Sequence, residues 1–404
     1  MAPTREAVKA AWAGTVERLA WGGRGMARAE DGRLILLEAP LALFPGERVE
    51  AELRWKPKHA EGRVTGWLQR DPRRADAGCD VAESCGGCDL REAGLHAGEL
   101  KRTLVEDLVR RQLPDAPPFE WLPAPPAARR QRIQVHWDGK ALGFHRRASH
   151  ALVPITTCPA AAEALSEALP RLLEALQARM LPTRAARWEL ATGTPPGTVV
   201  ASLEDGRAWR LEPDGWQRTE APLRHRLPCG TLSHGPGAFF QVCAAWAAEA
   251  FGTTLGDWGL EGGTLYDLYG GVGLFSALLG SRFKHRVLVE AHPGATAYAD
   301  QNLSTLGLTA EVHTADVAEW LPESLGTAED LILLDPPRAG LDPALAQRLL
   351  GASAGRLVLV GCDGAAFCRD LQRLQPAWTL SRLAFLDLFP WTVHVEGVAL
   401  LERS

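Results

Sequence analysis

The spacing of apolar positions divides the chain into two kinds of pattern. Between Val16 and Gln69, short runs such as Arg48 to Leu53 alternate apolar with charged residues, and turn-forming pairs such as Pro45-Gly46 separate them. Turn signals at this spacing predict a small all-β barrel. In the C-terminal part, helical stretches alternate with short apolar runs instead. These runs predict strands that are buried on both faces of a parallel sheet, and hence an α/β, doubly wound fold.

Two of the apolar runs lead directly into polar or reactive residues. Leu331 to Leu334 is followed by Asp335-Pro336-Pro337-Arg338, and Leu357 to Val360 is followed by Gly361-Cys362-Asp363. Ligands of open α/β sheets bind outside the carboxyl ends of the strands. We therefore expect Asp335 and Cys362 to face the same crevice.

The middle of the chain mixes helical and strand patterns. Leu95 to Gln112 and Ala160 to Met180 predict amphipathic helices, and Trp188 to Trp216 predicts strands of a second β layer. Pro114 to Pro126 is rich in proline and predicts a connector.

Basic residues recur in three places. Arg129 to Val135 alternates basic and apolar residues, and Gly143 to Arg147 adds an aromatic residue and more basic ones, a pattern that suits RNA and equally suits an exposed sheet edge. Arg54, Lys56 and Lys58 could contact phosphates, or could form the solvated face of a strand.

Composition narrows the function classes. The chain has 404 residues and a formal net charge of −5, so it is large enough for two or three domains and is not a generally basic nucleic-acid binder. Any polyanion site must be a local patch. No apolar run approaches the ~20 residues that span a bilayer, and the N-terminal sequence Met1-Ala2-Pro3-Thr4-Arg5 lacks the apolar core of a signal peptide. We expect a cytoplasmic protein without membrane contact.

Four of the eight cysteines have the spacing of metal ligands. Cys79, Cys85 and Cys88 lie within ten residues, and Cys158, followed by a proline, lies seventy residues further on. Three thiolates in one loop and a distant fourth can surround a zinc ion or an iron–sulfur cluster, and spacing alone does not separate the two.

A cofactor site is predicted where a glycine-rich turn follows a strand. Tyr269-Gly270-Gly271-Val272-Gly273 comes after the strand pattern at Thr264 to Leu268, and Glu290 ends the next strand, Arg286 to Val289. A carboxylate at this place can accept hydrogen bonds from ribose hydroxyls. Both S-adenosylmethionine-dependent and NAD-dependent enzymes use this order. Asp316 could lie near an adenine or in a surface turn.

The motifs together resemble the iron–sulfur-containing uracil-5 RNA methyltransferases, the family of the 23S ribosomal RNA enzymes. The resemblance covers nearly the whole chain and rests on three motifs: C-x5-C-G-G-C at 79–88, D-P-P-R at 335–338 and F-P-x-T-x-H-x-E at 389–396. The pattern at residues 23–49 resembles the TRAM domain, a small barrel of RNA-modifying enzymes. The resemblance of the whole chain implies a TRAM-like barrel over 1–70, a central cluster-bearing domain over 71–220 and a methyltransferase domain over 221–404.

The resemblance also implies roles for single residues. Cys362 would attack C6 of a uracil, and Glu396 would remove the C5 proton after methyl transfer, with His394 as a rival base. The residues that would contact S-adenosylmethionine are Gln241, Tyr269, Glu290 and Asp335. Those that would hold a [4Fe-4S] cluster are Cys79, Cys85, Cys88 and Cys158.

The resemblance implies a structured RNA as substrate, with 23S rRNA favoured and tRNA as the alternative. The target uridine must leave its stack to reach Cys362. A third possibility is an RNA-binding or assembly factor that has lost turnover, and retention of both Cys362 and Glu396 argues against this. We expect the protein to be a monomer. The chain departs from the family pattern at Gly270 and Cys243, and around the nucleophile at Gly361 and Asp363.

Overall fold

A computed structural model describes residues 9–322 and 325–404, which divide into two compact units. The first unit contains the chain up to Glu106, together with Phe144–Val153 and Trp391–Val393. The second contains Asp107–Gly143, Pro154–Pro390 and His394–Ser404. No helix among the described residues is both long enough and apolar enough to cross a membrane.

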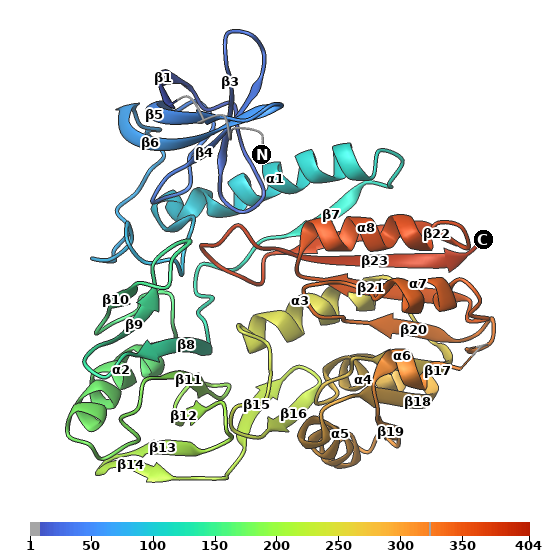
Figure 1. Cartoon of the computed structure of the whole chain (residues 1–404). Helices are drawn as coiled ribbons and strands as arrows, with labels where there is room; N and C mark the ends of the chain where they lie inside the picture. The colour runs from blue at the N-terminus through green and yellow to red at the C-terminus, as the bar shows by residue number, and fades with distance from the viewer. Residues whose placement is uncertain (1–8, 323–324) are drawn as a thin grey trace, which may run out of the picture. The chain divides into compact units, whose positions relative to one another are not determined.

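The first unit is built on a six-stranded sheet with the order β1-β5-β6-β4-β3-β2 (Figure 1). Its strands are β1 (Lys9–Thr15), β2 (Arg18–Leu19), β3 (Gly25–Arg28), β4 (Leu34–Glu38), β5 (Arg48–Trp55) and β6 (His59–Gln69). Along β5 exposed and buried residues alternate, as the sequence pattern predicts. Val49, Ala51 and Leu53 therefore join one apolar core with Ile35 and Leu37 of β4.

Helix α1 (Ala97–Gln112) and the short turn of helix η1 (Arg91–His96) follow the cysteine-rich segment. The helix confirms the amphipathic pattern of that stretch. Its apolar side chains Leu100 and Leu104 are almost completely buried.

Two large sheets have most of their strands in the second unit. The first has the order β10-β9-β8-β11-β12-β13-β14, and helix α2 (Glu163–Gln177) packs against it. Its strands are β8 (Arg132–Trp137), β9 (Leu142–His145), β10 (Leu152–Pro154), β11 (Ala186–Thr192), β12 (Val199–Leu203), β13 (Ala208–Glu212) and β14 (Gly215–Arg218). A hairpin of β15 (Leu223–Leu227) and β16 (Gly230–His234) then leads into helix α3 (Ala244–Asp257).

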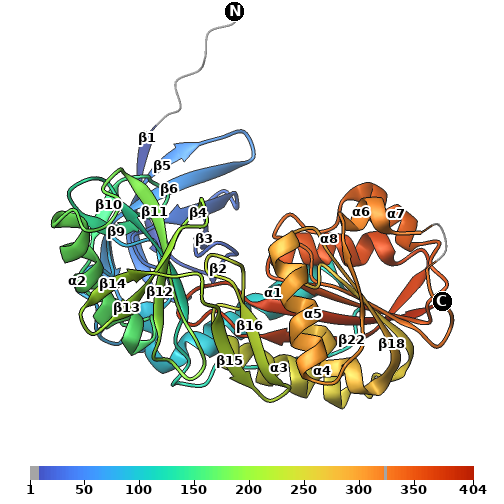
Figure 2. The same ribbon diagram turned by 90° about the horizontal axis from the view of Figure 1, so that it is seen from below.

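The second large sheet has eight strands in the order β19-β18-β17-β20-β21-β23-β22-β7 (Figures 1 and 2). The strands are β17 (Gly262–Leu268), β18 (Phe283–Glu290), β19 (Glu311–Thr314), β20 (Leu331–Leu334), β21 (Arg356–Gly361), β22 (Trp378–Leu386) and β23 (Glu396–Arg403), with β7 (Phe119–Leu122) at one edge. The five strands from β19 to β21 are parallel, and β23 runs antiparallel to β21 and to β22.

Helices connect the parallel strands of this sheet, as an α/β fold requires. They are α4 (Leu274–Leu279), α5 (Pro293–Thr305), α6 (Val317–Trp320), α7 (Pro343–Leu349) and α8 (Gly364–Leu374). The order of strands reverses between β17 and β20, where the chain leaves β17 to one side for β18 and later returns on the other side as β20. A ligand crevice is expected at the carboxyl ends of these two strands.

The proline-rich stretch is more than a connector. Residues Phe119–Leu122 form β7, which pairs in parallel with Leu383–Leu386 of β22. The prediction missed this strand because four residues between prolines carry too little periodicity to indicate one.

Candidate active site

The glycine-rich turn and the acid at the end of β18 lie together. The Gly271 amide donates a hydrogen bond to Glu290 Oε2 at 3.2 Å, and the Gly270 amide donates to the Val289 carbonyl at 3.1 Å. A side chain at position 270 would meet Leu288 at 2.6 Å, so Leu288 fills the space that a larger residue would need. The turn therefore holds Glu290 at the carboxyl end of its strand, as predicted.

Tyr269 begins this turn with an unusual backbone conformation. Its φ of +62° lies in the left-handed region, which costs a residue other than glycine about 1–3 kcal/mol. Burial raises the pKa of the Tyr269 phenol to about 12, and the carboxylates of Asp316 and Asp342 add to the shift. The neutral Tyr269 side chain therefore lies near Asp316, which also caps α6 by accepting from the Ala318 amide at 2.8 Å.

Buried carboxyl groups lie at the ends of β17 and β20. Asp267 is fully buried, and its Oδ2 accepts from the amide and hydroxyl of Ser276 at 2.9 and 2.6 Å. Burial raises the pKa of Asp267 to about 6, against the effect of these hydrogen bonds. Removal from water, with a smaller contribution from Asp267, raises the pKa of Asp335 to about 7. Burial thus keeps these two carboxyl groups protonated up to a higher pH than in water.

Strand register places Cys362 and Glu396 opposite each other. Gly361 of β21 pairs with Gly397 of β23 in the antiparallel ladder, so the next position outward sets Cys362 against Glu396. Glycines at the paired positions make room for Phe367 of α8, because a Cβ at Gly361 or Gly397 would meet its ring at 3.0 or 2.7 Å. Two segments far apart in sequence therefore bring a thiol and a carboxyl group together.

The charges of neighbouring groups shift the pKa values of Cys362 and Glu396. Burial raises the pKa of the Cys362 thiol to about 11, and Glu396 and Asp335 raise it further, whereas the charge and a hydrogen bond of Arg338 lower it. The pKa of Glu396 is raised by burial and by Asp335, and Arg338 lowers it. Arg338 had no role in the sequence prediction beyond the motif that contains it. Only the folded chain shows that its guanidinium acts on both groups.

Cys368 and His394, the alternatives to the assigned thiol and carboxylate, occupy other environments. Cys368 is fully buried within α8, and burial, followed by Asp363, raises the pKa of its thiol to about 12. His394 precedes β23, which begins at Glu396. His394 therefore lies outside the strand that carries Glu396.

Gln241 lies in the loop 235–243, between β16 and α3, and is half-buried. The same loop exposes Phe239, with 64% of the residue accessible to solvent, and the Arg132 guanidinium lies 5.1 Å from the centre of its ring. An exposed aromatic ring beside a guanidinium can stack on a nucleobase. The sequence did not predict a role for Phe239, because a single phenylalanine in a loop has no periodic pattern.

The predicted cluster cysteines are distributed over both units. Cys79, Cys85 and Cys88 are half-buried in the first unit, and Cys158 belongs to the second. Across residues 9–322 and 325–404, no group of three or more potential ligands is placed to hold a metal ion. Gly86 packs closely on the backbone at the end of β9, since a Cβ there would meet the His145 carbonyl at 2.9 Å.

The segment just after Cys88 holds part of the C-terminal motif. Within the first unit, the Asp89 amide donates to the Trp391 carbonyl at 2.9 Å, and Asp89 Oδ2 accepts from the Val393 amide at 3.1 Å. The Arg91 guanidinium lies 4.4 Å from the centre of the Trp391 ring. The motif that ends in Glu396 is therefore held by two of its residues, Trp391 and Val393, to the cysteine-rich segment.

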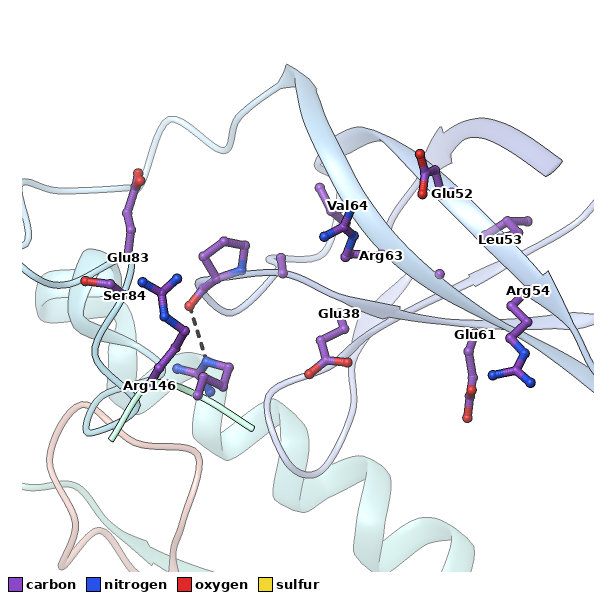
Figure 3. A pocket seen from close by; sticks show the side chains of 14 residues that line it. Glu38, Glu52, Leu53, Arg54, Glu61, Arg63, Val64, Glu83, Ser84 and Arg146 are labelled. Atoms are coloured by element: carbon purple, nitrogen blue, oxygen red, sulfur yellow. Dashed lines mark hydrogen bonds between the residues drawn. The ribbon is translucent and has the colours of Figure 1, made fainter. Parts of the chain in front are cut away.

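A groove of about 560 Å³ in the first unit collects several of the predicted basic residues (Figure 3). Arg54, Arg63 and Arg146 line it together with Glu38 and other acidic residues. Arg54 lies opposite Glu61 in the backbone ladder between β5 and β6. The side chain of Glu61 forms an ion pair with Lys56 at 2.5 Å. The groove is thus lined by both charges.

Comparisons with known proteins identify related sequences. Residues 326–404 match the family model described as tRNA (Uracil-5-)-methyltransferase. The chain is 33% identical to the 23S rRNA (uracil(1939)-C(5))-methyltransferase RlmD of Chromohalobacter salexigens, covering 96% of this chain and 89% of the relative. It is 32% identical to the RlmD of Pseudomonas putida, covering 96% and 93%.

A solved structure shares the fold. The tRNA (uracil-54, C5)-methyltransferase of Pyrococcus abyssi, in complex with S-adenosyl-L-homocysteine, superposes with a TM-score of 0.73 at 24% identity. The match covers 96% of this chain and all of that one.

Proposed function

The chain belongs to the family of RNA uracil-C5 methyltransferases, and on that basis we propose that it methylates C5 of a uridine in 23S rRNA through a covalent Cys362–C6 adduct. The observation that carries the proposal is the antiparallel register of β21 and β23, which sets Cys362 against Glu396. S-adenosylmethionine is the methyl donor. Its proposed contacts are Gln241, Tyr269, Glu290 and Asp335.

The first step is addition of the Cys362 sulfur to C6 of the uracil. A new S–C6 bond forms, and the electrons of the C5=C6 double bond move onto C5 and O4 as an enolate. The thiol must lose its proton for this, and its raised pKa of about 11 disfavours the loss. Arg338 lowers that pKa by its charge and by a hydrogen bond. We propose that Arg338 stabilises the attacking thiolate.

Methyl transfer and release follow. The C5 carbanion takes the methyl group from the sulfonium of S-adenosylmethionine, which leaves as S-adenosylhomocysteine. Glu396, once ionised, removes the C5 proton, and the electrons of that C–H bond restore the C5=C6 bond while the S–C6 bond breaks. Arg338 lowers the pKa of Glu396 and so favours the ionised form that accepts the proton.

A ribosomal substrate is favoured over tRNA by the relatives. Those at 32–33% identity are named as 23S rRNA enzymes and align over at least 89% of their length. The tRNA enzyme at 24% identity supports the fold. In the first unit, Arg54 and Arg146 would contact RNA phosphates from the groove of Figure 3, while Lys56 is already neutralised by Glu61.

We further propose that Cys79, Cys85, Cys88 and Cys158 hold a [4Fe-4S] cluster. Four thiols with this spacing are a suitable donor set, because cysteine thiolates are the usual ligands of iron–sulfur clusters. Three of them lie in one half-buried loop, free of disulfide bonds. The cluster supplies no step of the methylation proposed above.

Trapping with modified RNA tests the proposed function. The protein is incubated with 5-fluorouridine-substituted 23S rRNA fragments and S-adenosylmethionine. Because fluorine cannot leave as a proton does, the adduct should persist as a band that resists denaturing electrophoresis. Cys362→Ala should abolish the adduct, and Cys368→Ala should retain it. The opposite result would mean that the nucleophile is wrongly assigned, and no adduct with either cysteine intact would favour a binding protein without turnover.

A further inference from the structure

Two histidines outside the proposed catalytic groups form a buried pair. His225 of β15 and His234 of β16 each expose only 2% of their surface. Their Nε2 atoms lie 3.1 Å apart, and both rings lie nearly parallel to that of Phe240, with ring centres 4.4 and 5.4 Å from it. Phe240 directly precedes Gln241, so the pair lies beside the loop that carries a proposed cofactor contact.

The groups around the two imidazole rings fix which nitrogen atom of each ring donates a hydrogen bond and which one accepts. His234 Nδ1 lies 2.9 Å from the Gly235 carbonyl, which can only accept, so this nitrogen carries the proton. In a neutral ring His234 Nε2 is then an acceptor, and His225 Nε2 must donate to it. His225 Nδ1 is left to accept from the Thr194 hydroxyl, which lies 3.0 Å away.

The chain of hydrogen bonds continues to Gln131. Gln131 Nε2 donates to Thr194 Oγ1 at 2.7 Å and to the Gly193 carbonyl at 2.8 Å. Every donor and acceptor is thereby satisfied with both histidines neutral. The pKa values are consistent with neutral rings, since burial lowers the pKa of His225 to about 3 and that of His234 to about 4.

Gln131 also holds the far end of the same loop. Its backbone amide donates to the Val242 carbonyl at 2.7 Å, and its Oε1 accepts from the Ala245 amide at 3.4 Å. Ala245 lies in the first turn of α3, whose N-cap residue Cys243 provides no capping hydrogen bond from its side chain. Gln131 takes over this capping role.

We infer that Gln131, Thr194, His225 and His234 form a positioning network that fixes the loop 235–243, and with it Gln241, for binding S-adenosylmethionine. The loop is held at Gly235 by His234, at Phe240 by the two imidazoles, and at Val242 by Gln131. This inference rests on the proposed function, because it takes from there the contact between Gln241 and the cofactor.

Binding of S-adenosylmethionine to the full-length protein, measured by calorimetry, tests the network. Loss of one hydrogen bond that orders the loop should weaken binding about 3- to 10-fold in His234→Leu. The double variant His225→Leu/His234→Leu removes both buried partners, so its thermal stability should recover towards that of the wild type. Its affinity for the cofactor should stay low. If the histidines had a purely structural role, thermal stability and cofactor affinity would recover together in the double variant.

Two reference variants make the result decisive. Leu172→Ala, a fully buried leucine of α2, should lower stability and leave cofactor affinity within about twofold of the wild type. Gln241→Ala should weaken cofactor binding. If Gln241→Ala weakens it and a folded His234→Leu does not, the network inference is wrong. If Gln241→Ala binds normally, the proposed contact fails, and the inference fails with it. Wild-type protein without cofactor affinity would overturn the proposed function itself.

Histidine tautomers provide a measurement that needs no binding. In long-range ¹H–¹⁵N spectra of the wild-type protein, with the two signals assigned from His225→Leu and His234→Leu, His234 should carry its proton on Nδ1 and His225 on Nε2. The reverse assignment, or a protonated ring at neutral pH, would contradict the network.

Discussion

At the scale of single residues, the crevice combines a thiol with carboxyl groups whose ionisation burial suppresses. The pKa values of Cys362, Asp335 and Glu396 are all raised, and Arg338 lowers those of Cys362 and Glu396. Burial therefore favours the neutral forms of these groups, which cost less to remove from water than the charged forms. We expect the attacking thiolate and the ionised base to arise only when RNA and cofactor change these surroundings.

Glu396→Gln separates the two halves of the proposed reaction. The amide cannot accept the C5 proton, so the methylated adduct should form and then persist on ordinary, unfluorinated RNA. Turnover should fall about 10²- to 10⁴-fold, the usual contribution of a general base. Gel electrophoresis of the covalent complex and release of methylated RNA would measure both effects.

His394→Gln is the matched control for this experiment. It should release its product, because Glu396 remains. Persistence of the adduct in His394→Gln, with normal release in Glu396→Gln, would transfer the role of base to the histidine.

Asp335→Asn should change how stability depends on pH. The pKa of Asp335 is raised from 3.8 to about 7, so the native state binds this proton more tightly than the unfolded chain does. The stability that Asp335 contributes is complete below about pH 4 and is lost as pH rises through 7. The melting temperature of Asp335→Asn relative to the wild type should therefore increase from pH 5 to pH 8.

A surface aspartate provides the control for this pH dependence. Backbone hydrogen bonds from Ala141 and Lys140 lower the pKa of Asp138, so its stabilising effect is lost only as pH falls through that lowered value. The difference between Asp138→Asn and the wild type should be constant from pH 5 to pH 8. An equally constant difference for Asp335→Asn would show that its carboxyl group is not held neutral in the fold.

At the scale of elements, the sequence was most informative where a strand is buried on both faces. The run Leu331 to Leu334 matches β20 residue for residue, because acidic and proline residues bound it on either side. Glu290 likewise ends β18 as predicted. The edge strand β7 was missed because its pairing with β22 joins residues more than 260 positions apart. No local pattern reports such a partner.

The candidate site was predictable to a similar degree. The motifs identified Asp335, Cys362 and Glu396, and the fold brings these three residues together. The action of Arg338 on the thiol and the hydrogen bonds around His225 depend on side-chain positions. Single polar residues in loops and hairpins have no periodicity from which these contacts could be inferred.

The glycine pair at the end of β21 and β23 offers a test at this scale. A methyl group at Gly397 would lie 2.7 Å from the Phe367 ring, closer than atoms can pack. Gly397→Ala should destabilise the protein by about 1–3 kcal/mol and slow release of the methylated adduct from ordinary RNA by displacing Glu396 from Cys362. Chemical denaturation and adduct kinetics would measure the two effects.

Gly252→Ala in α3 is the corresponding control. Its added methyl group meets its nearest neighbour, Leu278, at 3.4 Å, an ordinary contact. Because alanine favours the helix, this variant should be as stable as the wild type or more stable. Equal behaviour of the two variants would exclude steric crowding by Phe367.

At the scale of the whole molecule, the division into three domains over 1–70, 71–220 and 221–404 stays a prediction. The compact units of the structure follow different boundaries, because three separate stretches of chain form the first unit. Of the proposed cluster ligands, Cys79, Cys85 and Cys88 belong to the first unit and Cys158 to the second.

Metal analysis tests the cluster independently of methylation. Protein purified without oxygen should contain about four iron and four sulfide per chain and absorb visible light. Cys158→Ser should lose most of both, whereas Cys229→Ser should retain them. Colourless protein with one zinc per chain would show that these cysteines form a zinc site instead.

The fastening of Trp391–Val393 to Asp89 has a practical consequence for dissecting this protein. An expressed fragment that stops at Glu106 would present Asp89 and Arg91 without the backbone groups and the indole that they bind. A fragment that starts after Glu106 would contain Trp391–Val393 without Asp89, to which this tripeptide is hydrogen-bonded. Val393 lies only three positions before Glu396. Neither piece is a self-sufficient module, so complementation with two co-expressed halves is the appropriate way to take this chain apart.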